Sequence, residues 1–161
     1  KAQKGKKEEM KSTMVVLQIT EKQIRWGHIG DSRLYYFHKD RMVSRTLDHS
    51  VPQMLALGGQ IKEREIRHHK DRNRVLRVLG TPWEGEAYSL ADPIEETGDQ
   101  AFILCSDGFW ELITEKEMEK TLKQSYSVAQ WLEKMEKIVQ KHGEGKDMDN
   151  YSAICVYIDS K

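Results

Sequence analysis

Short apolar runs separated by polar turns in the first third of the chain predict β-strands, and one of them, residues 23–29, alternates with the period of a strand. Four segments have this character: residues 12–20, 23–29, 33–38 and a short one near 42–43. In the second segment Ile24, Trp26 and His28 alternate with polar or small residues, so we interpret them as one packed face that includes a strand histidine. Short polar turns separate the segments, and we interpret them as an antiparallel β-meander with a tight turn at Gly30-Asp31-Ser32.

A helix is predicted next, from residue 51. Ser50 followed by Gln53 fits a capping box, and Gly58 fits a left-handed residue at the end of the helix. We expect Met54 and Leu55 to face the core.

The rest of the chain mixes helices and strands. The expected elements are a short helix at 61–69, a strand at 87–90, a buried strand at 101–105, helices at 115–123 and 128–142, and a strand at 151–158. The helix after Ser127 is the clearest, because its apolar residues recur with a helical period. Antiparallel strands combined with such helices predict an α+β fold in which helices pack on a sheet.

Charge and length limit the classes of partner. The chain has 161 residues, about one domain, with 26 lysines and arginines against 26 aspartates and glutamates. This balance favours no nucleic-acid partner, and no apolar run is long enough to cross a membrane. Lysines gather only near the start, so we interpret residues 1–11 as a basic tail or linker and residues 12–161 as the domain.

Cys105 and Cys155 both lie in apolar segments, with no local spacing typical of a zinc site. We interpret them as buried, reduced thiols, which indicates a cytoplasmic protein.

Three aspartates occupy equivalent places at predicted strand ends. Asp31 follows a strand in G-D-S-R, Asp107 follows one in S-D-G, and Asp149 precedes one in D-N-Y-S. Each of them could instead be a turn residue that bonds its own backbone. If the strand ends meet, however, the three provide hard oxygen ligands with no histidine or thiol nearby, a set that suits Mg²⁺ or Mn²⁺.

Six short segments, in order, carry a resemblance that covers the chain from Ser12 onward. They are G-H-I-G-D-S-R-L-Y-Y at 27–36, T-L-D-H-S at 46–50, L-G-G-Q-I at 57–61, R-N-R-V-L-R-V-L-G at 72–80, L-C-S-D-G-F-W at 104–110 and D-N-Y-S at 149–152. Together they resemble the bacterial branch of the metal-dependent type 2C protein serine/threonine phosphatases.

The resemblance implies an αββα sandwich with a binuclear Mg²⁺ or Mn²⁺ centre between its sheets. It implies that Asp107 and Asp149 are metal ligands, that Asp31 belongs to an additional metal, and that residues 50–80 form a flap beside the active site. The implied reaction is hydrolysis of phosphoserine and phosphothreonine on proteins by metal-bound water.

One departure from that family is large. Its N-terminal D-G-H-G-G motif, which supplies the bridging aspartate and a histidine, has no match in residues 1–26. We therefore expect a fragment, roughly the C-terminal two-thirds of the domain and hence a partial αββα sandwich, that holds half a metal site and has little activity alone. Beyond the metal ligands we assign it no catalytic residue.

Several alternatives stay open at this point. The chain could be a degenerate, non-catalytic binding or regulatory module on the same scaffold. Arg72 and Arg74 could contact the phosphoprotein substrate or form surface salt bridges, and His49 more plausibly orders its turn than acts in catalysis. Exposed sheet edges predict, as a hypothesis, a homodimer.

Overall fold

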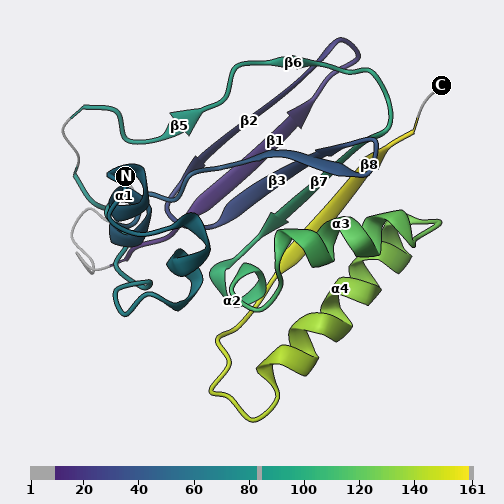
Figure 1. The fold of residues 1–161 in the computed structure, drawn as a ribbon. Coiled ribbons are helices and arrows are strands. Elements are labelled where there is room, and N and C mark those ends of the chain that lie inside the picture. Colours follow the sequence, from purple (N-terminus) through teal and green to yellow (C-terminus); the bar gives the residue numbers. More distant parts are fainter. Residues whose placement is uncertain (1–9, 83–84, 160–161) are drawn as a thin grey trace.

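The computed structural model describes residues 10–82 and 85–159, so most of the basic tail expected at 1–11 lies outside the described residues. Figure 1 shows its elements, which are β1 (Met14–Ile19), β2 (Gln23–Ile29), β3 (Arg33–His38), β4 (Arg41–Arg45), α1 (Val51–Leu57), the 3-10 helix η1 (Glu63–His68), β5 (Ser89–Leu90), β6 (Ile94–Glu95), β7 (Gln100–Cys105), α2 (Asp107–Trp110), α3 (Glu115–Lys123), α4 (Val128–Gly143) and β8 (Ala153–Ile158).

Two antiparallel sheets form the centre of the molecule. In the first sheet β1 pairs with β2 along the whole predicted hairpin, and the short strands β5 and β6 pair with the other edge of β2. The second sheet has the order β4-β3-β7-β8. The α+β class expected from the sequence is therefore confirmed.

The predicted meander is wrong at one connection. Strands β2 and β3 lie in different sheets, and the turn at Gly30-Asp31-Ser32 carries the chain from one to the other. Gly30 has a φ of 103°, a left-handed value that favours glycine. Alternation within a segment predicts a strand but not its partner, and residues 33–37 are buried on both faces because β3 is a central strand between two layers.

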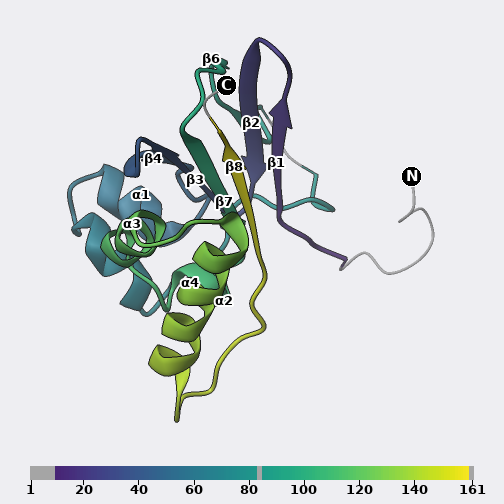
Figure 2. The same ribbon diagram turned by 90° about the vertical axis from the view of Figure 1, so that its right-hand side faces the viewer.

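A separate hydrophobic core fills each gap between layers. Ile24, Leu34, Tyr36 and Phe102 are buried between the two sheets. On the other face of the second sheet, a larger core includes Phe37 together with Trp131, Met135 and Val139 of α4. Figure 2 shows α3 and α4 on that side, with β1 and β2 on the opposite side of the second sheet.

The outer face of the first sheet has no covering layer among the described residues. Its apolar side chains are exposed, including Met14 at 45%, Val16 at 47% and Leu90 at 55%. The described part of the chain therefore has two sheets and one helical layer, which fits a partial sandwich. None of the helices in the described ranges is long and apolar enough to span a bilayer.

Capping explains where the helices begin and end, with one correction at α1. The Ser127 hydroxyl accepts a hydrogen bond from the Gln130 amide, which confirms the predicted start of α4. In α1 the left-handed residue is Gly59, with a φ of 70°, whereas Gly58 has a φ of −78°. The amides of Gly59 and Gln60 bond back to carbonyls of the last helical turn, so this end is a Schellman motif one residue later than expected.

The predicted inner face of α1 is also wrong in part. Met54 is 57% exposed and Leu55 is half-buried, whereas Pro52 and Gln53 are buried. Gln53 faces inward because its side-chain amide oxygen, Oε1, accepts a hydrogen bond from Arg45. A satisfied amide can occupy a position that a periodic pattern assigns to apolar residues.

Candidate functional site

The single helical turn α2 brings two of the three aspartates together. It follows β7 directly and begins at Asp107, while Ser106 exchanges backbone and side-chain hydrogen bonds with Ser152 just before β8. A Cβ placed on Gly108 would lie 2.6 Å from the carbonyl oxygen of Asn150 and 3.2 Å from that of Asp149. The absent side chain therefore lets the loop that carries Asp149 lie against α2.

The same helical turn also holds the third aspartate. The indole Nε1 of Trp110 donates a buried hydrogen bond of 3.0 Å to the carbonyl oxygen of Asp31. Asp31 is 7% exposed. Thus the S-D-G-F-W segment supplies Asp107 and fixes the positions of both Asp31 and the Asp149 loop.

A buried ion pair supports this arrangement. Arg33 donates two hydrogen bonds, of 2.8 and 2.7 Å, to the carboxylate of Asp48, and both side chains are almost inaccessible to solvent. The Arg33 guanidinium lies 3.4 Å from the centroid of the Trp110 ring. The G-D-S-R, T-L-D-H-S and S-D-G-F-W segments are therefore joined by one stack of charged and aromatic groups.

His49 holds the turn that contains Asp31. Its Nδ1 accepts a hydrogen bond from the Gly30 amide, and its backbone amide donates to the Gly30 carbonyl. Its Nε2 lies 2.9 Å from the Ser89 hydroxyl, and its ring stacks on His28. Burial, the neighbouring His28 and then Arg77 lower the pKa of His49 to about 4. These contacts support our interpretation that His49 orders the turn, and His28, which is 5% exposed, is a packed strand residue as expected.

Asp31 and Asp107 influence each other electrostatically. Burial, and after it the negative charge of Asp107, raise the pKa of Asp31 to about 6. When two partly buried carboxylates repel each other, binding of a cation or a proton relieves the repulsion, which is typical of functional sites.

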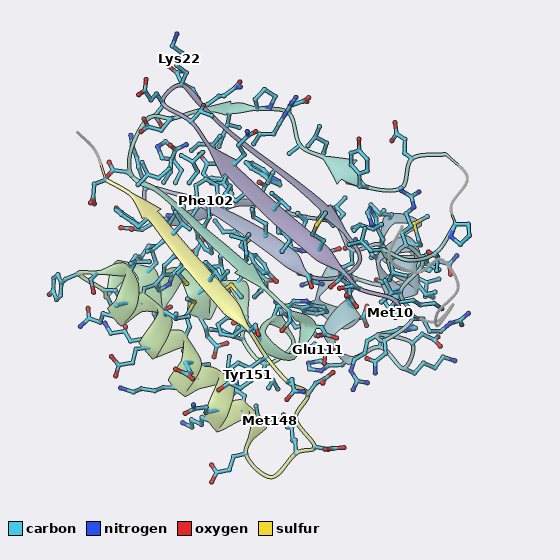
Figure 3. The ribbon with its side chains drawn as sticks, turned by 180° about the vertical axis from the view of Figure 1, so that it is seen from behind. Met10, Lys22, Phe102, Glu111, Met148 and Tyr151 are labelled. Atoms are coloured by element: carbon cyan, nitrogen blue, oxygen red, sulfur yellow. The ribbon has the colours of Figure 1, made fainter. Side chains whose placement is uncertain are left out.

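Asp107 and Asp149 line one cavity of about 490 Å³, together with Arg67, Arg72 and Glu111. Figure 3 shows Glu111 and Tyr151 at the end of the second sheet where β7 ends and β8 begins, far from Lys22 in the turn between β1 and β2 of the first sheet. The cavity therefore lies at the carboxyl end of β7, where the sequence predicts the chemistry.

The two substrate-binding candidates from the sequence differ in position. Arg72 lines the cavity, and its Nε lies 3.2 Å from the carboxylate of Glu111. Arg74 is not among the cavity-lining residues; its side chain is 68% exposed and lies near Asp71. Arg67, which sequence reasoning did not select, also lines the cavity, and no spacing signal distinguishes it from the other charged residues of its segment.

The available donors suit a hard cation in type but not in number. Asp107 and Asp149 each accept a hydrogen bond from the next backbone amide, the turn geometry that was the alternative to metal binding. Among residues 10–82 and 85–159, no three histidine, cysteine, aspartate or glutamate side chains group closely enough to hold a metal ion. Both cysteines are free thiols, and burial raises the pKa of Cys155 to about 12, so no thiolate competes at this carboxylate-rich place.

Known proteins that are similar to this chain are bacterial serine/threonine phosphatases. No family model matches the chain. The serine/threonine phosphatase stp of Listeria innocua is 31% identical over 147 residues, which are 91% of this chain and 56% of the Listeria protein. The crystal structure of Stp1 from Staphylococcus aureus superposes with a TM-score of 0.82 at 24% identity, over 94% of this chain and 58% of that one.

In sequence and fold, the chain is similar to bacterial serine/threonine phosphatases. It spans little more than half the length of the relatives it matches. The catalytic domain of the phosphatase PstP, solved in complex with two manganese ions, has the same fold, with a TM-score of 0.74 at 22% identity over 94% of this chain and 61% of that domain. The resemblance read from the six segments is thus confirmed.

Proposed function

We propose that this phosphatase relative contributes to metal-dependent hydrolysis of phosphoserine and phosphothreonine on proteins. The observation that carries the proposal is the contact of Gly108 with the Asp149–Asn150 backbone, which brings Asp107 and Asp149 to one cavity. The relatives named above are serine/threonine phosphatases, which supports a phosphorylated protein as the substrate.

Asp107 and Asp149 would bind Mn²⁺ or Mg²⁺, and Asp31 would contribute to an additional cation beside Asp107. Such a cation, when bound, activates water and neutralises charge on a phosphoryl group. The described residues alone provide too few ligands for a complete metal centre. We expect metal binding by this chain to be weak and its hydrolytic activity to be low.

The test is calorimetric titration with Mn²⁺, followed by hydrolysis of p-nitrophenyl phosphate and a phosphothreonine peptide, each with Mn²⁺ or with chelator. The variants are Asp107→Asn and Asp149→Asn. Asp147→Asn is the matched control, because Asp147 lines the same cavity without belonging to the proposed ligands. We expect Mn²⁺-dependent heat and turnover that the first two variants abolish and the control retains.

Turnover that survives chelation, or survives both ligand substitutions, would contradict the proposal. The absence of both metal binding and turnover would favour a non-catalytic module, the alternative that the incomplete donor set also supports. We further propose a cytoplasmic location, because both cysteines are free thiols. The homodimer stays a prediction, which light scattering would test.

A further inference from the structure

Arg67 occupies an unusual place in the wall of the cavity. It belongs to η1, and its side chain is only 9% exposed. Its Nη2 donates to the carboxylate of Glu115 at the start of α3, and its guanidinium carbon lies 5.8 Å from the centroid of the Trp110 ring. The side chain is therefore held from two directions beside the cavity that contains Asp107 and Asp149.

The other terminal nitrogen of Arg67 has no hydrogen-bond partner. Within the described residues, Nη1 is one of two buried side-chain nitrogens left without an acceptor, and the second, on Arg25, does not line this cavity. A buried donor without a partner costs about 1–3 kcal/mol of stability. Because the Arg67 side chain lines the cavity, a ligand bound there could supply the missing acceptor after a small movement of the guanidinium.

We propose that Arg67 is an anion-binding residue of this cavity and that its ligand is phosphate or a phosphoryl group. A guanidinium offers two parallel donors that match two phosphate oxygens, and at Arg67 only one of the two terminal nitrogens is used. The view that the natural anion is the phosphate of a phosphoprotein substrate rests on the function proposed above.

A bound anion and the Glu115 carboxylate would compete for the guanidinium of Arg67. Because Nη1 is shielded from solvent, an anion must draw the guanidinium toward the cavity, and this weakens its contact with Glu115. Asp107 and Asp149 line the same cavity and repel an anion, so a divalent cation beside them should strengthen phosphate binding. Loss of the Glu115 charge should strengthen it as well.

The experiment is calorimetric titration of the whole chain with inorganic phosphate, in chelator and again in excess Mn²⁺. We expect Arg67→Lys to weaken phosphate binding about tenfold, because the ammonium keeps the charge but loses the fork. Arg64→Lys is the matched control, since Arg64 is an exposed residue of the same helix outside the cavity and should bind phosphate like the parent chain.

Glu115→Gln separates anion binding from a purely structural ion pair. It removes the negative charge from the same pair but leaves the guanidinium intact, so we expect phosphate binding several-fold tighter than in the parent chain. Equal weakening by Arg67→Lys and Glu115→Gln would overturn the proposal, as would unchanged binding in Arg67→Lys or no phosphate binding by the parent chain in either buffer.

The anion site and the proposed metal-dependent function can each fail without the other. Phosphate binding that requires Arg67 in a chain that binds no Mn²⁺ would support the anion site and contradict the proposed function. Mn²⁺-dependent turnover together with phosphate binding that Arg67→Lys leaves unchanged would support the proposed function and contradict the anion site.

Discussion

The indole nitrogen of Trp110 donates a hydrogen bond to the backbone carbonyl of Asp31, 79 residues earlier in the chain. Trp110 is three residues after Asp107 in one helical turn, so this bond holds together two separate segments that each carry a candidate carboxylate. The bond therefore makes a structural residue responsible for the geometry of the candidate site.

Trp110→Phe removes this donor and leaves the Asp31 carbonyl buried without a partner. We expect a loss of about 1–3 kcal/mol in the free energy of unfolding, measured by urea denaturation. Mn²⁺ affinity should also fall about tenfold or more, because loss of a group that orients a metal ligand typically lowers metal affinity by that much.

Trp131→Phe is the matched control for this substitution. Trp131 is equally buried, and its indole nitrogen donates a hydrogen bond of 3.1 Å to the carbonyl of Met118, in the core away from the cavity. It should lose similar stability without a change in Mn²⁺ affinity. Equal losses of Mn²⁺ affinity in the two variants would show that Trp110 acts only through overall stability.

Gly108→Ala tests the contact between α2 and the Asp149 loop. The new methyl group would lie 2.6 Å from the Asn150 carbonyl oxygen, so the loop must move, and we expect a destabilisation of about 1–3 kcal/mol together with weaker Mn²⁺ binding. Gly58→Ala is the control, because its nearest neighbour would be 3.4 Å away and its φ of −78° suits alanine. That variant should be neutral or slightly more stable. A neutral Gly108→Ala would contradict the close contact.

Asp48→Ala leaves the buried guanidinium of Arg33 without its carboxylate. We expect a loss of about 3–5 kcal/mol in unfolding free energy, because an uncompensated charge remains in the core. Glu133→Ala removes a carboxylate from the exposed pair with Lys137 and should have no measurable effect on stability. Similar losses in both variants would exclude burial as the reason.

Stability should depend on pH through His49. Because burial lowers its pKa in the folded chain to about 4, against an ordinary value of 6.5, the unfolded chain binds more protons between these values. Its contribution is therefore complete above pH 6.5 and is lost as the pH falls toward 4. With allowance for solvent screening, we expect this loss to be on the order of 1 kcal/mol.

The measurement for His49 is the difference in unfolding free energy between the parent chain and His49→Gln, from pH 4 to pH 7 in chelator. A difference is needed because the raised pKa of Asp31 acts in the same range with the opposite sign. His68→Gln, at an exposed histidine, should keep the slope of the parent chain. A parallel pH profile for His49→Gln would contradict the assignment.

The sequence predicts the individual elements well because their signals are local. The hairpin of β1 and β2, the strand β7 and the capped helices α3 and α4 all lie where alternation, apolar runs and capping residues indicate. Those signals depend on residues within one turn or one strand, which is why they can be read without the fold. Local signals do not show which strands pair, and the expected meander was wrong for that reason.

The sequence by itself determined that carboxylates occur at three strand ends. Only the tertiary structure decided that two of them share a cavity, because the contact between Gly108 and Asn150 and the hydrogen bond between Trp110 and Asp31 join segments far apart in the chain. Arg67 also emerged only there, since a donor becomes unpaired only when packing excludes water from it. Residue type and spacing determine which groups are available, and long-range packing determines which of them meet.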